Sequence, residues 1–404
     1  MIYPRFRFGI STLLLTAASI FNSPPVLAGE VVPYIGASVR YDSNLFRLSD
    51  TVASAQVIGS ENKSDTLYIA SVGVNALGDF ARQRYELALR FDETHFQRFS
   101  HLDNQGGNAR LVWDWQTVKT LQGRAGYDYV RGLTSFEDVQ GTVRDIRTQR
   151  RAFGDAGFEI YPGVRFRLGV ESDDVLHSAE SRRASEHETE IEEAALVFRS
   201  RADNTVEGYY RRARVDFVTV ADVAGTAVDN DYRGADSGVR LRWRFTGDST
   251  LDTRVAYSDR EHVALAQRNF HSWTGRVAHE WRLTGKSQWK TEIWRETTSA
   301  EDSSSSYTLG RGISLAPTWQ ATARIGVRPA WTYRENDYPG GAGTALTGTP
   351  ARADKIETWR LATDYRWLPR FRMSLQYEHG SRESNLDVFD YDYDSATVGL
   401  DFTF

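Results

Sequence analysis

The feature that most limits the fold of this chain is an alternation of apolar and polar residues that lasts for ten or more positions at a time. Successive side chains of a β-strand point to opposite faces, so a period of two predicts strands with one apolar and one polar face. Clear examples run from Tyr85, Ala109, Val164, Val239 and Phe371. Strands of soluble sandwiches have about 5–6 residues, whereas a tilted membrane-spanning strand needs about 9–11. The length of the pattern therefore favours a transmembrane β-barrel over a soluble sandwich.

The number of alternating segments predicts the size of the barrel. We expect an all-β, antiparallel, up-and-down barrel of about 18 strands (16–18), with short periplasmic turns and long extracellular loops. An even number of strands places both ends of the barrel in the periplasm. The longest connections are 42–65, 134–146, 219–231 and 335–353. The strands are predicted to begin near Val32, Thr66, Arg84, Asn108, Leu121, Thr148, Val164, Glu186, Asn204, Tyr232, Thr250, Arg268, Ser287, Ser306, Trp319, Lys355, Arg370 and Asp390.

The first 28 residues have the pattern of a secretory signal. Arg5 and Arg7 precede a short apolar run from Phe8 to Phe21, and Val26-Leu27-Ala28 supplies a cleavage site. Cleavage after Ala28 would leave one barrel domain, residues 29–404. Beyond Ala28 no apolar run reaches the length of about 18 residues that a membrane-spanning helix needs. We therefore predict export to the outer membrane of a Gram-negative bacterium.

Aromatic residues and the last strand fit the same prediction. The chain has 11 Trp and 19 Tyr, and barrels place such rings at the two membrane interfaces. Trp281 and Trp289 flank one predicted turn, and Trp331 and Trp359 flank one predicted loop. Val398, Leu400, Phe402 and Phe404 form one face of the last strand, which resembles the signal that the barrel-assembly machinery reads. The expected partners are this machinery, outer-membrane lipid and lipopolysaccharide.

Charge and motif content exclude several other classes of protein. The formal net charge of -5 argues against a nucleic-acid-binding protein, which would be strongly basic. There is no phosphate-binding Gly loop and no HExxH motif, and the eight His residues are scattered. Pro329 is expected to mark a bulge or a rim position, because it cannot donate a ladder hydrogen bond. We expect no enzyme activity, no catalytic residues, no metal site and no cofactor.

The alternation of residues along each strand, which we call strand parity, assigns every strand residue to the inner or the outer face of the barrel. It predicts a polar lumen dominated by arginine. The charged residues assigned to the inner face are Arg40, Arg90, Asp92, Arg110, Asp114, Arg124, Asp128, Arg165, Arg167, Glu171, Arg240, Arg242, Arg244, Asp252, Arg276, Glu280, Arg324, Arg360, Asp364, Arg366, Arg372 and Glu378. One interpretation is a structural network in which Arg pairs with acids on neighbouring strands. The other is a channel wall for an anionic or hydroxyl-rich solute, because guanidinium groups bind carboxylate and phosphate. Both roles are compatible, and loops 42–65 and 335–353 are long enough to fold inward.

A short segment after the first strand suggests a more specific role. The residues Tyr41, Asp42, Asn44, Leu45, Phe46, Arg47 and Leu48 follow the pattern Tyr-Asp-x-Asn-Leu-Phe-Arg-Leu. This segment resembles the start of the EpsL-like proteins of exopolysaccharide operons, which are grouped with β-barrel porins. Some relatives have a second Asp where Ser43 stands here. The resemblance implies a role in polysaccharide synthesis or export, and it brings no catalytic residues.

Three functional hypotheses follow from the sequence. The first is a conduit for exopolysaccharide, in which the barrel would work with polysaccharide and periplasmic export proteins. The second is a general or substrate-specific diffusion porin for small anionic or sugar solutes. The third is a structural or docking barrel in an export complex.

Overall fold

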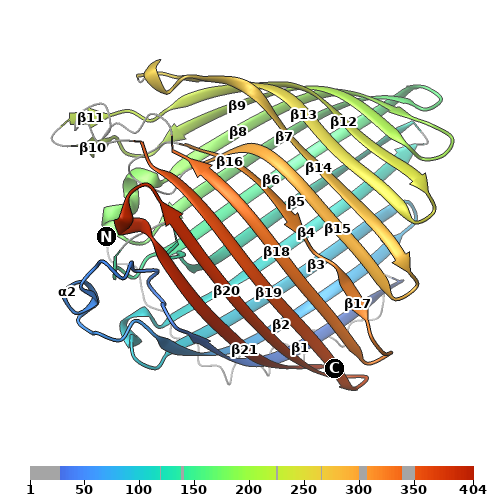
Figure 1. Ribbon diagram of the computed structural model, residues 1–404. Helices are drawn as coiled ribbons and strands as arrows, with labels where there is room; N and C mark the ends of the chain where they lie inside the picture. Colours follow the sequence, from blue (N-terminus) through green and yellow to red (C-terminus); the bar gives the residue numbers. More distant parts are fainter. Residues whose placement is uncertain are drawn as a thin grey trace, which may run out of the picture.

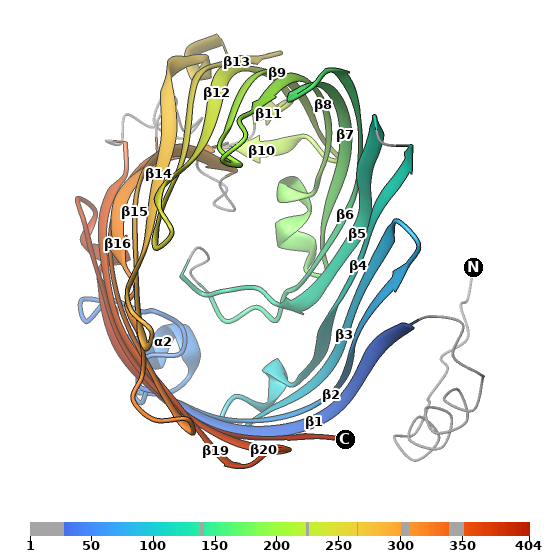
Figure 2. The same ribbon diagram turned by 90° about the vertical axis from the view of Figure 1, so that its right-hand side faces the viewer.

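The chain forms a closed antiparallel β-barrel (Figures 1 and 2). The structure is a computed structural model that describes residues 28–118, 120–137, 141–223, 226–264, 266–299, 307–338 and 351–404. Residues 1–27 of the predicted signal segment, 1–28, and most of loop 335–353 lie outside the described residues. Ala28, the predicted cleavage position, is the first residue of strand β1.

The barrel wall consists of long strands that each pair with their neighbours in the chain. Their bounds are β1 (Ala28–Asp42), β2 (Asp65–Phe80), β3 (Gln83–Phe96), β4 (Asn104–Val118), β5 (Leu121–Leu133), β6 (Ile146–Tyr161), β7 (Val164–His177), β8 (His187–Arg199), β9 (Thr205–Phe217), β12 (Tyr232–Thr246), β13 (Ser249–His262), β14 (Phe270–Thr284), β15 (Ser287–Ser299), β16 (Tyr307–Leu315), β17 (Thr318–Gln320), β18 (Ile325–Asp337), β19 (Ala353–Leu368), β20 (Phe371–Ser384) and β21 (Tyr391–Thr403). Strands β10 (Ala221–Val223) and β11 (Thr226–Val228) form a separate hairpin.

The predicted number of strands is confirmed. The described residues form one sheet of 19 strands, but β16 and β17 both lie between β15 and β18 and share one position, which leaves 19 − 1 = 18. The sheet closes between the first and last strands, where Tyr34 is paired with Thr403 and Asp42 with Ser395. Closure leaves no free sheet edge, as a strand-built membrane protein requires.

The two ends of the barrel differ in their connections. At one end, the short-turn end, neighbouring strands are joined by turns such as 162–163, 247–248 and 285–286. The other end, the long-loop end, carries α2 (Ser54–Ile58), the β10–β11 hairpin and the 3-10 helices η1 (Ser100–Leu102), η2 (Glu180–Ser185), η3 (Ala266–Arg268) and η4 (Asp387–Phe389) (Figure 1). None of the described helices is long and apolar enough to cross a membrane.

One predicted strand boundary is wrong. The sequence predicts a strand from Trp319, but Trp319 lies in β17, at the end of the preceding strand, and β18 begins only at Ile325. The strand is interrupted at Ala316 and Pro317, and Pro317 has no N–H for the ladder. Pro329 itself is paired in register with Leu361. The irregularity predicted at Pro329 therefore lies in the neighbouring strand.

This shift also corrects one lumen assignment. Arg324 lies in the turn between β17 and β18, where its carbonyl oxygen accepts a hydrogen bond from the Arg366 N–H at 2.9 Å, and its side chain is exposed. The prediction that Arg324 lines the lumen wall is therefore wrong. The turn, residues 321–324, contains no Gly, Pro, Asp or Asn, so it gave no turn signal in the sequence.

The outer face of the barrel carries the apolar residues that parity assigns to it. Exposed side chains on this face include Val39, Leu168, Val239, Ile293 and Leu375. On the outer face, Trp281 is paired with Trp289 near a short turn, whereas Trp331 and Trp359, whose ring centroids lie 5.8 Å apart, are near the middle of β18 and β19. Val398 and Leu400 of β21 are exposed on the same outer face, and Phe404, which follows β21, is also exposed. Their role in barrel insertion remains a prediction.

Candidate functional site: the lumen and its narrowed mouth

The inner face carries the charged residues that parity assigns to it, apart from Arg324. Strand register places them opposite the exposed apolar residues and on the same face as Arg382, whose Nη1 donates a 2.6 Å hydrogen bond to the Glu137 carbonyl inside the barrel. Many form ion pairs between adjacent strands. The N···O distances are 2.6 Å for Arg124–Asp114, 3.2 Å for Arg110–Asp128, 2.6 Å for Arg360–Glu378 and 3.2 Å for Arg372–Asp401. The predicted cross-strand network is therefore present in the wall.

The densest part of this network lies on β7, β8, β9 and β12. Arg167 Nη2 lies 2.7 Å from carboxylate oxygens of both Glu193 and Glu207, and Arg240 pairs with the same two carboxylates. The guanidinium of Arg240 also stacks on the Tyr209 ring, with 3.8 Å between the guanidinium carbon and the ring centroid. Glu193 and Glu207, absent from the predicted lumen set, are the acids that neutralise two predicted arginines.

The segment that resembles the EpsL-like proteins forms a tight turn inside the long-loop end. The Asp42 carboxylate, 1% exposed, accepts hydrogen bonds from Arg47 Nη1 at 2.8 Å and Nη2 at 3.0 Å, from Arg40 Nη2 at 3.0 Å and from the Asn44 N–H at 3.1 Å. Asn44 Oδ1 accepts from the Leu48 N–H at 3.0 Å. Arg47 has a φ of 54° and stacks on the Tyr393 ring at 3.5 Å.

Apolar residues of the same turn hold neighbouring loops in place. Phe46 is fully buried, and its ring centroid lies 4.8 Å from that of Phe99 and 4.7 Å from that of Phe136. The same cluster also contains Leu45, Leu48, Leu67, Phe96 and Leu102. We call residues 42–49, 99–102 and 133–137 the mouth plug. Six of the seven motif residues are buried in the plug, whereas Tyr41 is 46% exposed on the outer face.

The loop after β5 extends the plug across the mouth. It reaches from β5 to β20, where Arg382 donates to Glu137, and Figure 2 shows it inside the ring of strands. Asp145 holds the far end of this loop, because its carboxylate accepts from Thr134 Oγ1 at 2.7 Å and the Ala179 N–H at 3.0 Å and lies 2.6 Å from His177 Nδ1. The long-loop end of the lumen is therefore narrowed by linked loops.

The Asp145 contact predicts an acid-sensitive loop. Burial raises the pKa of Asp145, but hydrogen bonds from His177, Thr134 and the Ala179 N–H outweigh it and lower this pKa to about 2. Since the folded-state pKa lies below the ordinary value of 3.8, the carboxylate stabilises the loop above about pH 4 and loses this effect as the pH falls toward 2. The contribution at neutral pH is about 2 kcal/mol.

The substitution D145N should reproduce the acid state at neutral pH. We expect trypsin to cleave the variant faster at Arg144 or Arg147, and we expect the folded barrel to remain resistant elsewhere. Equal cleavage of the variant and the wild type at pH 7 would show that the carboxylate does not hold the loop.

Beneath the plug, the wall on β1 to β5 contains a hollow of about 410 Å³, which we call the wall niche. Its charged and polar lining includes Arg40, Arg90, Asp92 and Thr94, and its apolar lining is Leu45, Leu67, Phe96, Leu133 and Phe136. Hollows of this size hold small organic ligands. The niche combines arginines of the wall, among them Arg40 and Arg90, with the apolar underside of the plug.

Arg40 and Arg90 are held by side chains of their own and of neighbouring strands, and both keep donors for a ligand. Arg90 Nε lies 2.7 Å from Asp92 Oδ1, and Arg90 Nη2 donates to Ser71 Oγ at 3.0 Å. Arg40 Nε donates to Ser395 Oγ at 3.0 Å, and its Nη2 donates to Asp42. Within the described ranges, Nη1 of either guanidinium has no hydrogen-bond partner, so each presents a free donor. In the same described ranges, no group of three or more His, Cys, Asp or Glu residues could hold a metal ion.

Parity predicted the charged half of this site but not the plug. Arg40, Arg90 and Asp92, which belong to the predicted lumen set, line the niche together with the motif residues Asp42, Leu45 and Arg47. Phe96, Phe99, Leu102 and Phe136 were not predicted. Their signal in the sequence was that large apolar residues recur in the connections 97–103 and 134–146, which are otherwise polar.

No family model matches this chain, and no curated protein matches it. Similar solved structures are outer-membrane porins. The outer membrane protein OpdK from Pseudomonas aeruginosa has 10% identity and a TM-score of 0.50, covering 93% of this chain and 99% of OpdK. A BenF-like porin from Pseudomonas fluorescens Pf-5 has 7% identity and a TM-score of 0.51, with coverage of 93% and 99%. P. aeruginosa OccK2 (OpdF) has 10% identity and a TM-score of 0.50, with coverage of 93% and 98%.

At these identities the likeness establishes the fold alone, a closed 18-stranded barrel of the porin type. None of the comparisons supports membership of the EpsL-like proteins. That resemblance rests on the seven motif residues, and six of these are buried in the mouth plug.

Proposed function

We propose that this chain is an outer-membrane channel for small solutes that carry a carboxylate beside an apolar or aromatic group. The observation that carries the proposal is the wall niche, where Arg40 and Arg90 lie beside Leu67, Phe96 and Phe136. Guanidinium groups bind carboxylates with charge-assisted hydrogen bonds and stay charged at any relevant pH. The apolar side of the niche suits the rest of such a solute.

The orientation follows from the usual asymmetry of outer-membrane barrels. Long loops face the exterior and short turns face the periplasm, so the plug and the niche lie near the extracellular entrance. Solute entering from outside would pass the plug, bind at the niche and continue along the arginine-rich wall. A signal segment cleaved after Ala28 and insertion by the assembly machinery belong to the same proposal.

Two similar structures contain ligands of this chemical class. OccK2 was determined in complex with glucuronate, and OpdK was determined with vanillate. Both ligands are carboxylates, and their presence is an observation on OccK2 and OpdK. It supports the diffusion-porin hypothesis over the polysaccharide conduit, because both ligands are small solutes. For the docking-barrel hypothesis, the described residues offer no specific support.

Uptake into liposomes tests the proposal. Liposomes containing the purified barrel should take up benzoate about tenfold faster than benzamide at low concentration, because the charge-assisted contact is worth about 1.5–3 kcal/mol. The benzoate rate should also saturate, whereas the benzamide rate should rise linearly. Equal, unsaturable rates for both compounds would contradict a carboxylate-binding channel.

A further inference from the structure

The wall niche has two walls of different origin. One is the barrel itself, where side chains of β1 to β5, such as Arg40, Leu67 and Arg90, line the hollow. The other is the mouth plug, which supplies lining residues from two of its segments. We call residues 42–49 the first plug segment and residues 133–137 the last plug segment. The complete niche therefore exists only while both segments are in place.

The two plug segments are joined mainly by apolar contact. The ring centroids of Phe46 and Phe136, one from each segment, lie 4.7 Å apart. In the part of the chain that the structure describes, no hydrogen bond or ion pair joins the two segments. Leu45 from the first segment and Phe136 from the last both line the niche. A solute whose ring contacts these two side chains would add a link between the segments.

The closed turn of the first plug segment depends on the contacts around it. Arg47 has a φ of 54°, in the left-handed region that costs free energy for a residue other than glycine. Its Nε is buried, and among the described residues it has no hydrogen-bond partner. Backbone strain of this kind persists only where surrounding contacts hold it. Further contacts from a bound solute would therefore stabilise the closed turn.

A ligand shifts a conformational equilibrium toward the arrangement that it binds better. A carboxylate solute in the niche contacts both the barrel and the plug, whereas with the plug displaced it would contact the barrel alone. We infer that bound solute holds the mouth plug closed, so that the mouth shuts behind the solute and the solute leaves toward the short-turn end. The inference rests on the proposed function, because it requires carboxylate binding at the niche.

Hydrogen exchange of plug amides in the purified wild-type barrel tests the inference. The Leu45 N–H donates to the Lys63 carbonyl at 3.0 Å and the Thr134 N–H to the Asp145 carbonyl at 2.9 Å, so both amides exchange only when the plug opens. With benzoate at ten times its dissociation constant, exchange should slow by about tenfold, because a ligand specific for the closed plug reduces the open fraction in that proportion. Benzamide at the same concentration should not slow it.

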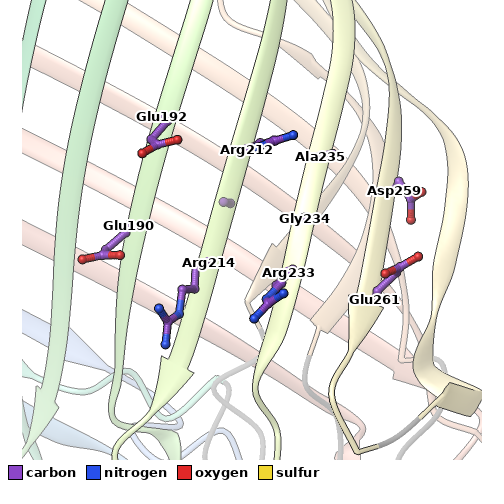
Figure 3. A pocket seen from close by; sticks show the side chains of 10 residues that line it. Glu190, Glu192, Arg212, Arg214, Arg233, Gly234, Ala235, Asp259 and Glu261 are labelled. Carbon is purple, nitrogen blue, oxygen red and sulfur yellow. The ribbon is translucent and has the colours of Figure 1, made fainter.

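A pair of arginine variants shows whether the protection comes from the niche. R90Q should lose most of the protection, since Arg90 is one of the two donors offered to the carboxylate. Its partners are Asp92 and Ser71 in the barrel wall, and its exchange without solute reports whether the plug is intact. The matched control R214Q should be protected like the wild type. Arg214 lies on the outer face of β9, where Figure 3 shows it beside Arg233 on the neighbouring strand.

The variant D42A gives a second measurement, because binding and closure must affect each other equally. By charge alone, removal of the Asp42 carboxylate, which accepts from Arg40 at 3.0 Å, would strengthen benzoate binding. Opening of the plug removes one wall of the niche and has the opposite effect. We expect D42A to half-saturate at a benzoate concentration about tenfold higher than the wild type or more. D50A, with an exposed carboxylate, should half-saturate like the wild type.

The outcomes separate this inference from the proposed function. Selective, saturable uptake of benzoate with unchanged or faster exchange of the Leu45 and Thr134 amides would overturn the inference and leave the channel function intact. Tighter benzoate binding by D42A, or full protection of R90Q, would overturn it as well. Unselective uptake by the wild type would instead contradict the channel function, and the inference would fall with it.

Discussion

Replacing Asp42 by alanine is expected to open the mouth plug and to raise the single-channel conductance of the barrel. The Asp42 carboxylate is almost fully buried and accepts hydrogen bonds from Arg40, Asn44 and Arg47. Its removal leaves the guanidinium of Arg47 buried without its charge partner, which typically costs about 3–5 kcal/mol. A loss of that size would shift the equilibrium between the closed and the open arrangement of the plug toward the open one by a factor of about a hundred or more.

The matched control for D42A is D50A in the same loop. Asp50 pairs with Lys63 at 2.7 Å, but its side chain is 89% exposed, and an exposed pair contributes about 0–1 kcal/mol. Planar-bilayer recording should show higher conductance for D42A alone. A shift of the folded band in an unheated gel checks that both variants retain the barrel. Wild-type conductance in a folded D42A barrel would contradict the role of Asp42 in holding the plug.

The barrel could be predicted from the sequence because each strand carries its own evidence. Alternation is local, and an outer face of apolar residues is required along almost every strand of a membrane barrel. The error at Trp319 shows where this local evidence ends. Pro317 is a residue type typical of turns, whereas the actual turn at residues 321–324 consists of Ala, Thr and Arg. The predicted start of the strand at Trp319 therefore lies too early in the chain, and Arg324 is assigned to the strand instead of the turn.

The plug could not be predicted in the same way, because its contacts join loops far apart in the sequence. Phe46 packs on Phe99 and Phe136, and Glu137 contacts Arg382 on the other side of the seam between β1 and β21. The motif at Asp42–Leu48 suggested a link to polysaccharide, whereas its buried residues have a structural explanation in the plug. Strand parity predicts whether an arginine lies on the inner or the outer face of the barrel, but it does not predict how far that arginine lies from the mouth.

The wall niche gives the second large expected effect, in the double variant R40Q/R90Q. Glutamine keeps a hydrogen-bonding side chain but removes the positive charges of Arg40 and Arg90, while Arg47, which is paired with Asp42, and Arg131 remain in the lining. Uptake of benzoate should fall about tenfold, toward the rate for benzamide, because the charge-assisted contacts are lost. The control is R124Q/R372Q, which removes two lumen arginines that do not line the niche and should reduce benzoate uptake far less.

The benzoate-to-benzamide uptake ratio of R40Q/R90Q is the most direct test that the niche selects carboxylates. Arg40 also contacts Asp42, so a loosened plug would raise both rates together, while loss of the binding site lowers the benzoate rate alone. We predict a ratio near 1 for R40Q/R90Q, with an unchanged benzamide rate and a wild-type ratio in the control. A wild-type ratio in R40Q/R90Q, or an equal loss in R124Q/R372Q, would contradict this account.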